Sequence, residues 1–136
     1  MYLPDTNACI RLMNGSSNVL LEAWRRQPAK NIFTAATVEA ELSFGVENSH
    51  PSEQKANAFV PNQFLVPYGT VHFDARCARA CGSLRAKLKR NGTPIGPMDM
   101  MIAAAALAHN LIVVTHNADE FAKVQGLRLE GWEIVS

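Results

Sequence analysis

Four acidic residues stand where predicted strands and helices would carry them toward one place. They are Asp5 in LPDTN, Glu41 in VEAEL, Asp99 in GPMDMMIAAAA and Glu120 in VVTHNADEF. No histidine or cysteine lies at ligand spacing beside them, and carboxylate oxygens are the donors that a hard cation such as magnesium prefers. Because a magnesium ion held by acids is the usual means of attacking a phosphodiester, these residues predict a small nuclease.

Each acid also has an ordinary structural explanation when it is taken alone. Asp5 stands at a strand-to-helix corner, where it would cap the helix. Glu41 would be a solvated glutamate on a helix. Asp99 and Glu120 fall in first turns, where the helix dipole favours a negative charge, and Asp119 competes with Glu120 for the fourth position. The nuclease prediction therefore depends on all four acids converging.

Apolar runs and turn residues predict an alternation of strands and helices. Strands are expected at residues 2–5, 32–35, 65–68 and 112–115, and residues 127–135 are expected to form a terminal strand or a hairpin around Gly131. Helices are expected from Thr6 or Asn7, as the cap, to residue 13 and at residues 19–26, 37–48, 51–64, 75–90, 98–110 and 119–123. This order predicts an α/β sandwich with a mainly parallel central sheet. Ligand sites in such sheets lie outside the carboxyl ends of the strands.

Length and composition predict one globular domain that spans residues 1–136. The chain has 48% hydrophobic residues and a net charge of +1, which excludes a disordered or strongly charged class. No apolar run approaches the ~20 residues of a membrane span, and the first residues lack the features of a secretion signal. We therefore expect a cytoplasmic protein with no membrane partner.

The three cysteines predict free thiols rather than a disulfide framework. Their number is odd, and Cys77 and Cys81 lie one helical turn apart, which suits buried thiols in a reducing compartment. A zinc site built from Cys9, Cys77 and Cys81 is the alternative, although the paired spacing of common zinc motifs is missing.

Positive charge is concentrated in one predicted helix. No acidic residue occurs between Asp74 and Asp99, whereas six basic residues do: Arg76, Arg79, Arg85, Lys87, Lys89 and Arg90. A solvated helix face would explain this pattern, but next to an acidic metal site it favours a surface that contacts nucleic-acid phosphates.

Longer motifs resemble one known family over nearly the whole chain. They are the opening LPDTNACI, the segment EL-x-x-GVENS, the long segment from RAKLKRNG through GPMDMMIAAAALAHNLIVVTHNADEF, and the final GLRLEGW. Together these segments resemble the PIN-domain ribonucleases, and within them the VapC toxins of bacterial toxin–antitoxin pairs. The resemblance implies a PIN-like α/β/α sandwich.

The resemblance also implies roles for the four acids. Asp5 and Asp99 match the family's main metal-binding aspartates, and Glu41 matches the second acid. Glu120 matches the acid just before Phe121, although many relatives carry an aspartate where this chain has Asn117 or Ala118. All four acids are implied to be catalytic, with Mg²⁺, or Mn²⁺ in its place, as the cofactor. Asn7 and Thr115 match polar residues that often line the pocket.

The activity implied by the resemblance is that of a toxin which arrests growth by cutting transfer RNA or another structured RNA. The implied partners are a cognate VapB-type antitoxin whose tail blocks the acidic pocket, operator DNA bound only through the antitoxin, and a second copy in a homodimer.

One departure from the family concerns Pro4, which stands where relatives carry an aliphatic residue. Proline is unexpected in a central strand and could displace Asp5. One alternative is a catalytically weak PIN-fold module that binds RNA or a partner, its site impaired by Pro4 or by the missing upstream aspartate. A separate alternative is a DNA-acting nuclease of the related structure-specific group. Retained magnesium affinity distinguishes the nuclease from the weak module.

Overall fold

Five short strands pair in parallel throughout. A computed structural model describes residues 1–133 of the chain. The strands are β1 (Tyr2–Pro4), β2 (Phe33–Ala35), β3 (Gly69–Val71), β4 (Ile112–Val114) and β5 (Leu129–Glu130). The pairs β1–β4, β4–β5 and β2–β3 are all parallel. A single bridge between Tyr2 and Ile32 places β2 beside β1, so the spatial order is β3-β2-β1-β4-β5 and the predicted parallel sheet is confirmed.

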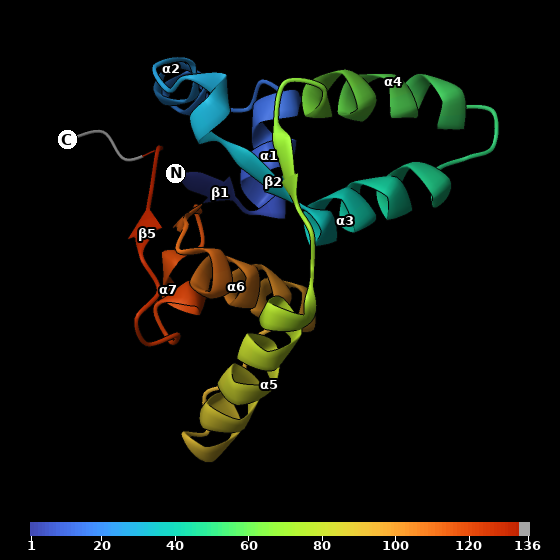
Figure 1. Ribbon diagram of the computed structural model, residues 1–136. Helices are drawn as coiled ribbons and strands as arrows, with labels where there is room; N and C mark the ends of the chain where they lie inside the picture. Colours follow the sequence, from blue (N-terminus) through green and yellow to red (C-terminus); the bar gives the residue numbers. More distant parts are fainter. Residues whose placement is uncertain (134–136) are drawn as a thin grey trace.

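Helices surround these strands and form two hairpins (Figure 1). The helices are α1 (Thr6–Met13), α2 (Asn18–Arg25), α3 (Ala36–Glu47), α4 (Gln54–Leu65), α5 (Ala75–Arg90), α6 (Pro97–His109) and α7 (Ala118–Phe121), with a short 3₁₀ helix η1 at Ala29–Asn31. The α3–α4 hairpin projects from one side of the molecule, and the α5–α6 hairpin lies at the bottom of the view. Among residues 1–133, no helix combines the length and the apolar character that crossing a bilayer requires.

The helix α6 is the central helix of the core. Its residues 102–106, Ile-Ala-Ala-Ala-Ala, are all almost completely buried. A helix that is apolar all round packs on more than one side, and the alanines allow its neighbours to approach closely. On one side lies α5, which buries Cys77, Leu84 and Leu88, residues that recur at helical spacing. This packing fixes the start of α6, where Asp99 lies.

Two sequence-based boundaries were wrong, and a third is described only in part. The strand expected at residues 65–68 lies at β3, four residues later, because Leu65 ends α4 and the side chain of Val66 is 78% exposed. The first helix is capped by Asp5, whose side chain accepts a hydrogen bond from the Ala8 amide, and not by Thr6 or Asn7. The terminal strand or hairpin expected at residues 127–135 contains only β5; its last residues fall within 134–136, outside the described residues.

Candidate active site

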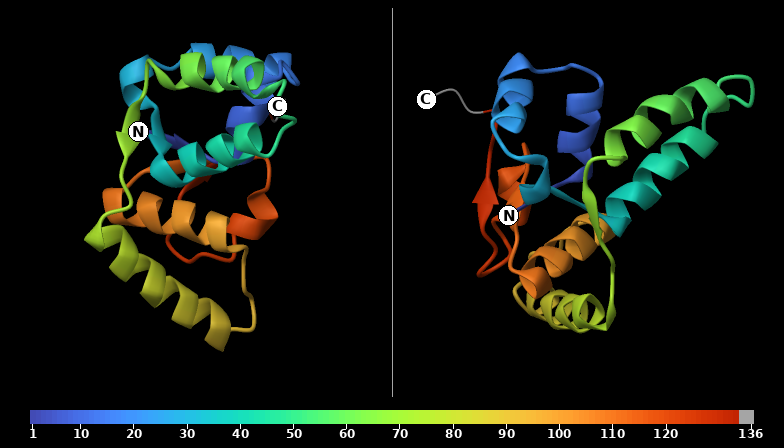
Figure 2. Two further views of the ribbon diagram at one scale, coloured as in Figure 1. Left: turned by 90° about the vertical axis from the view of Figure 1, so that its right-hand side faces the viewer. Right: turned by 45° about the horizontal axis from the view of Figure 1, so that its top comes forward.

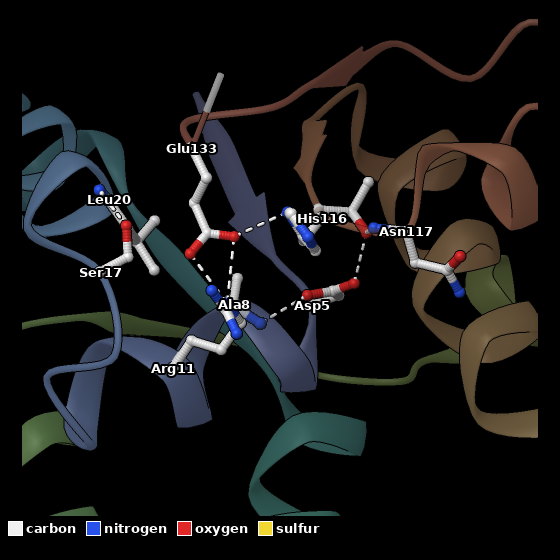
Figure 3. Close-up of polar contacts among 9 residues, drawn as sticks. Asp5, Ala8, Arg11, Ser17, Leu20, His116, Asn117 and Glu133 are labelled. Atoms are coloured by element: carbon white, nitrogen blue, oxygen red, sulfur yellow. Dashed lines mark hydrogen bonds and ion pairs between the residues drawn. The ribbon is translucent and has the colours of Figure 1, made fainter. Parts of the chain in front are cut away.

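Asp5 is held rigidly at the carboxyl end of β1. It is only 3% exposed. One carboxylate oxygen, Oδ1, accepts from the Ala8 amide at 2.8 Å, and the other, Oδ2, accepts from the Thr115 hydroxyl at 2.6 Å (Figure 3). The capping role and a site role are therefore compatible, since the cap uses one oxygen. Burial raises the pKa of Asp5, while these two hydrogen bonds lower it and the charges of Glu41 and Glu133 raise it further.

The unexpected Pro4 does not displace Asp5. The Asp5 amide donates to the Val114 carbonyl at 2.9 Å, as a regular parallel ladder requires. Because amide groups alternate between the two sides of a strand, the missing donor of Pro4 faces β2 instead of β4. On that side β1 is joined to β2 by the bridge at Tyr2. The proline thus lacks its donor on the side where β1 and β2 share a single bridge, and the β1–β4 pairing that positions Asp5 is intact.

Asp99 lies in the first turn of α6, next to Asp5 in space. Its pKa is raised to about 6, first by burial and then by the negative charges of Asp5, Glu120 and Glu41. Glu41 projects from α3, and its carboxylate accepts a hydrogen bond from the Thr6 hydroxyl. These interactions show that segments far apart in the sequence bring their acids close enough to repel one another.

The structure distinguishes between Glu120 and Asp119. Glu120 is half-buried and accepts from the Gly96 amide at 3.0 Å, beside the start of α6. Its charge contributes to the raised pKa of Asp99. Asp119 is exposed and is not among the charges that raise the pKa of Asp99. Geometry therefore favours Glu120 as the fourth acid of the cluster.

A small cavity of about 210 Å³ opens between these elements. Three of the four acids line it, namely Asp5, Glu41 and Asp99. The other lining residues are the polar Thr6, Asn7 and Asn117 and the apolar Ile10. Glu120 lies beside the cavity and does not line it. The donor set consists of oxygens and amide groups. Burial is the main cause of the raised pKa values of Asp5 and Asp99, and the charges that add to both shifts are those of neighbouring acids. A hard divalent cation fits both properties.

One polar cluster near the site was missed by sequence reasoning. Glu133 accepts from Arg11 Nε at 2.8 Å and 3.1 Å through its two oxygens, and His116 Nδ1 lies 2.8 Å from the same carboxylate (Figure 3). This gives His116 a structural contact. Glu133 lies in a turn and belongs to no periodic pattern, so no sequence signal indicated it. Its link to the site is electrostatic, because its negative charge raises the pKa of Asp5.

The cysteines do not gather as the zinc alternative required. All three are free thiols, as expected. Within residues 1–133, the one group of potential metal ligands that contains a cysteine combines Cys77 with Asp74 and His109, and it includes neither Cys9 nor Cys81. Cys9 instead lies in the core, where burial and the nearby Asp5 raise its pKa well above the usual range.

Comparison with known proteins gives the family. The PIN-domain model matches residues 2–127. The chain belongs to the PIN-domain family. Within it, the chain is 36% identical to a tRNA(fMet)-specific endonuclease VapC of Shigella flexneri over 131 residues, which cover 96% of this chain and 97% of the relative. A Rickettsia felis relative named ribonuclease VapC2 is 33% identical over 98% of both chains. This PIN domain is therefore a VapC-type ribonuclease.

Solved structures agree with this PIN-domain assignment. DNA-bound VapBC from Salmonella typhimurium superposes with a TM-score of 0.89 at 32% identity and covers 96% of this chain and 97% of that one. VapBC2 from Rickettsia felis, bound to a fragment of promoter DNA, gives a TM-score of 0.87 at 33% identity, with 96% and 98% covered. The predicted PIN-like fold is thereby confirmed.

Proposed function

We propose that this protein is the toxin of a toxin–antitoxin pair and acts as a magnesium-dependent endoribonuclease on transfer RNA. The observation that carries the proposal is the cavity in which Asp5, Glu41 and Asp99 converge, with Glu120 beside it. The substrate is inferred from relatives that are named as tRNA(fMet)-specific endonucleases and align over nearly the whole chain. RNA as substrate and three free thiols fit a cytoplasmic location.

Each acid has a distinct part in the proposed mechanism. Asp5 and Asp99 would hold the ion, and the Thr115 hydroxyl keeps the Asp5 carboxylate in one orientation. A bound Mg²⁺ supplies positive charge for the scissile phosphate and acidifies water; Mn²⁺ would do the same. Glu41 and Glu120 would orient the attacking water or accept its proton, and the hydrogen bonds from Thr6 and from the Gly96 amide fix their positions.

The basic helix α5 supports RNA binding. Lys87 and Arg90 line a cavity of about 430 Å³ together with Lys123, which comes from the segment after α7. Three cations around one concave surface suit a phosphate backbone, and such binding weakens steeply with salt. Arg76 differs, because its guanidinium donates to the Ala108 carbonyl at 2.7 Å and so has a structural contact. We expect Lys87→Glu to weaken RNA binding more than Arg76→Gln does.

An apolar groove next to the acidic cavity supports antitoxin binding. It encloses about 360 Å³ between α1, α3 and α4, with Met13, Leu42 and Val60 among its lining residues. Ile10 and Glu41 line both this groove and the acidic cavity. A VapB-type tail with apolar side chains could lie in the groove and place a basic side chain among the acids. Operator DNA would then be bound through the antitoxin. We also expect a homodimer, as the family resemblance implies, and light scattering measures the oligomeric state.

The test is cleavage of a total transfer-RNA pool by purified, antitoxin-free protein. We compare the unmodified chain with Asp5→Asn and Asp99→Asn, and with the neighbouring pair Glu120→Gln and Asp119→Asn, each with magnesium and with chelator. Discrete fragments should appear with the unmodified chain and Asp119→Asn only, and chelator should abolish them. Fragments that persist in Asp99→Asn would indicate a contaminating nuclease, and an intact pool with RNA still bound would favour the weak binding module.

A further inference from the structure

Three side chains with different donor atoms meet at the open end of the α5–α6 hairpin. Asp74 caps α5, Cys77 lies in its first turn, and His109 is the last residue of α6. The left view of Figure 2 shows the start of α5 and the end of α6 at the same end of the hairpin, opposite the loop that joins the two helices. Their ligand atoms all lie within 4.8 Å of one another. None of the three lines the acidic cavity.

One of these side chains has a buried ligand atom that makes no hydrogen bond in the described part of the chain, and the other two make contacts within the group. His109 Nε2 is buried and has no hydrogen-bond partner within residues 1–133. The Cys77 thiol lies 3.6 Å from the His72 carbonyl and also contacts the Asp74 carboxylate; the Cys77 amide and then this thiol lower the pKa of Asp74. Asp74 uses Oδ1 to cap α5, accepting from the Cys77 amide at 3.0 Å, and its Oδ2 faces His109 Nε2 at 3.5 Å. A buried imidazole nitrogen without a hydrogen bond is costly, so its position beside a thiol and a carboxylate needs an explanation.

The donor types and spacing match zinc. Zinc binds thiolate sulfur at ~2.3 Å and imidazole nitrogen or carboxylate oxygen at ~2.0 Å in a tetrahedron, so its ligand atoms are roughly 3.3–3.6 Å apart. Asp74 Oδ2 and His109 Nε2 are 3.5 Å apart, which is within that range and too long for a good hydrogen bond. All three ligand atoms lie within 4.8 Å of one another, so a side-chain rotation of Cys77 would bring its sulfur into the same range. Magnesium does not suit a thiolate.

We propose that Asp74, Cys77 and His109 form a second metal site that takes zinc and fastens the open end of the α5–α6 hairpin. Thiolate and carboxylate would balance the charge of the ion, and water would complete the tetrahedron. The guanidinium of Arg76 is directed to the Ala108 carbonyl, where it also joins the two helix ends. The site is structural: it lies outside the acidic cavity and ties together the two helices that carry the basic face and Asp99.

Cobalt(II) serves as the spectroscopic probe on the full metal-free chain, because a thiolate ligand gives a charge-transfer band that oxygen ligands do not. We expect this band with the unmodified chain, at one equivalent, and a rise in melting temperature when zinc is added. Cys77→Ser and His109→Gln should each abolish the band and the rise in melting temperature. Metal affinity should fall by more than the ~10–100-fold loss that is typical when a residue behind the ligands is changed. His109→Gln alters a partly exposed residue, so it remains informative if Cys77→Ser folds poorly.

Two control variants distinguish this site from other metal sites. Cys81→Ser removes the thiol one turn further along the same helix, and Asp99→Asn removes an acid of the cavity; both should keep the cobalt band and the zinc effect. The proposal is overturned if the unmodified chain shows no band, if His109→Gln retains it at full affinity, or if Cys81→Ser removes it. A failed ribonuclease assay would leave all of these readouts unchanged.

Discussion

Replacing Asp99 by asparagine should stabilise the metal-free protein. Burial and three neighbouring acids raise the pKa of Asp99 from 3.8 to about 6. A difference of about 2 in pKa corresponds to ~3 kcal/mol of unfolding free energy at neutral pH. Because Asp99 is partly exposed, solvent screening reduces this to about 1 kcal/mol. For a chain of this size that is a rise of roughly 3–5 °C in melting temperature.

The sign of the pH dependence follows from the raised pKa. An aspartate that is harder to ionise in the folded protein destabilises it; the cost is full above about pH 6 and falls as the pH falls toward ~3.8, below which the carboxyl group is protonated in both states. In chelator, the advantage of Asp99→Asn should therefore be full near pH 7.5 and almost absent near pH 4. Saturating magnesium should reverse the order, because only the unmodified site binds the ion well.

The assay is thermal unfolding followed by circular dichroism, in chelator and in magnesium, across this pH range. Asp119→Asn is the matched control, since that acid is exposed and is not among the charges that affect Asp99. It should change the melting temperature little at any pH. If Asp99→Asn is no more stable than the unmodified chain near pH 7.5 in chelator, the acids do not repel one another as the geometry indicates, and the reasoning fails.

Three further outcomes are expected. Pro4→Val should change the unfolding free energy by less than about 1 kcal/mol and leave RNA cleavage unaltered, because the β1–β4 pairing that positions Asp5 does not use the amide of residue 4; a large loss of activity would show that the proline positions the site. Arg11→Ala should lower the free energy of unfolding by about 1–2 kcal/mol, because the carboxylate of Glu133, whose side chain is 8% exposed, loses its cation. In a double-mutant cycle measured by chemical denaturation, the double variant with Glu133→Ala should lose less than the sum of the two single changes. Tyr68→Phe should cost about 1–2 kcal/mol, because Trp24 Nε1 loses the partner it holds at 2.9 Å; an unchanged denaturation midpoint would contradict this.

Local patterns predicted most of the fold correctly because they depend on neighbours in the chain. The stripe of Cys77, Leu84 and Leu88 follows from helical periodicity, and the start of α6 at Pro97 follows from the preference of proline for a first turn. The same reasoning failed at Leu65 and Val66, where a short apolar run fits a strand as well as a helix end. Only the packing of α4 decided between the two.

The amino-acid sequence by itself determined the four acids, their order along the chain and the parallel architecture that could bring them together. Tertiary structure decided which atoms meet, because side chains converge from segments whose separation no local rule encodes. It placed Glu120, and not the adjacent Asp119, near Asp99. It also joined Arg11 to Glu133 across 122 positions of sequence, and it brought His109 to Asp74 at the far end of the hairpin. Such contacts depend on how helices pack over the sheet, a property of the whole fold.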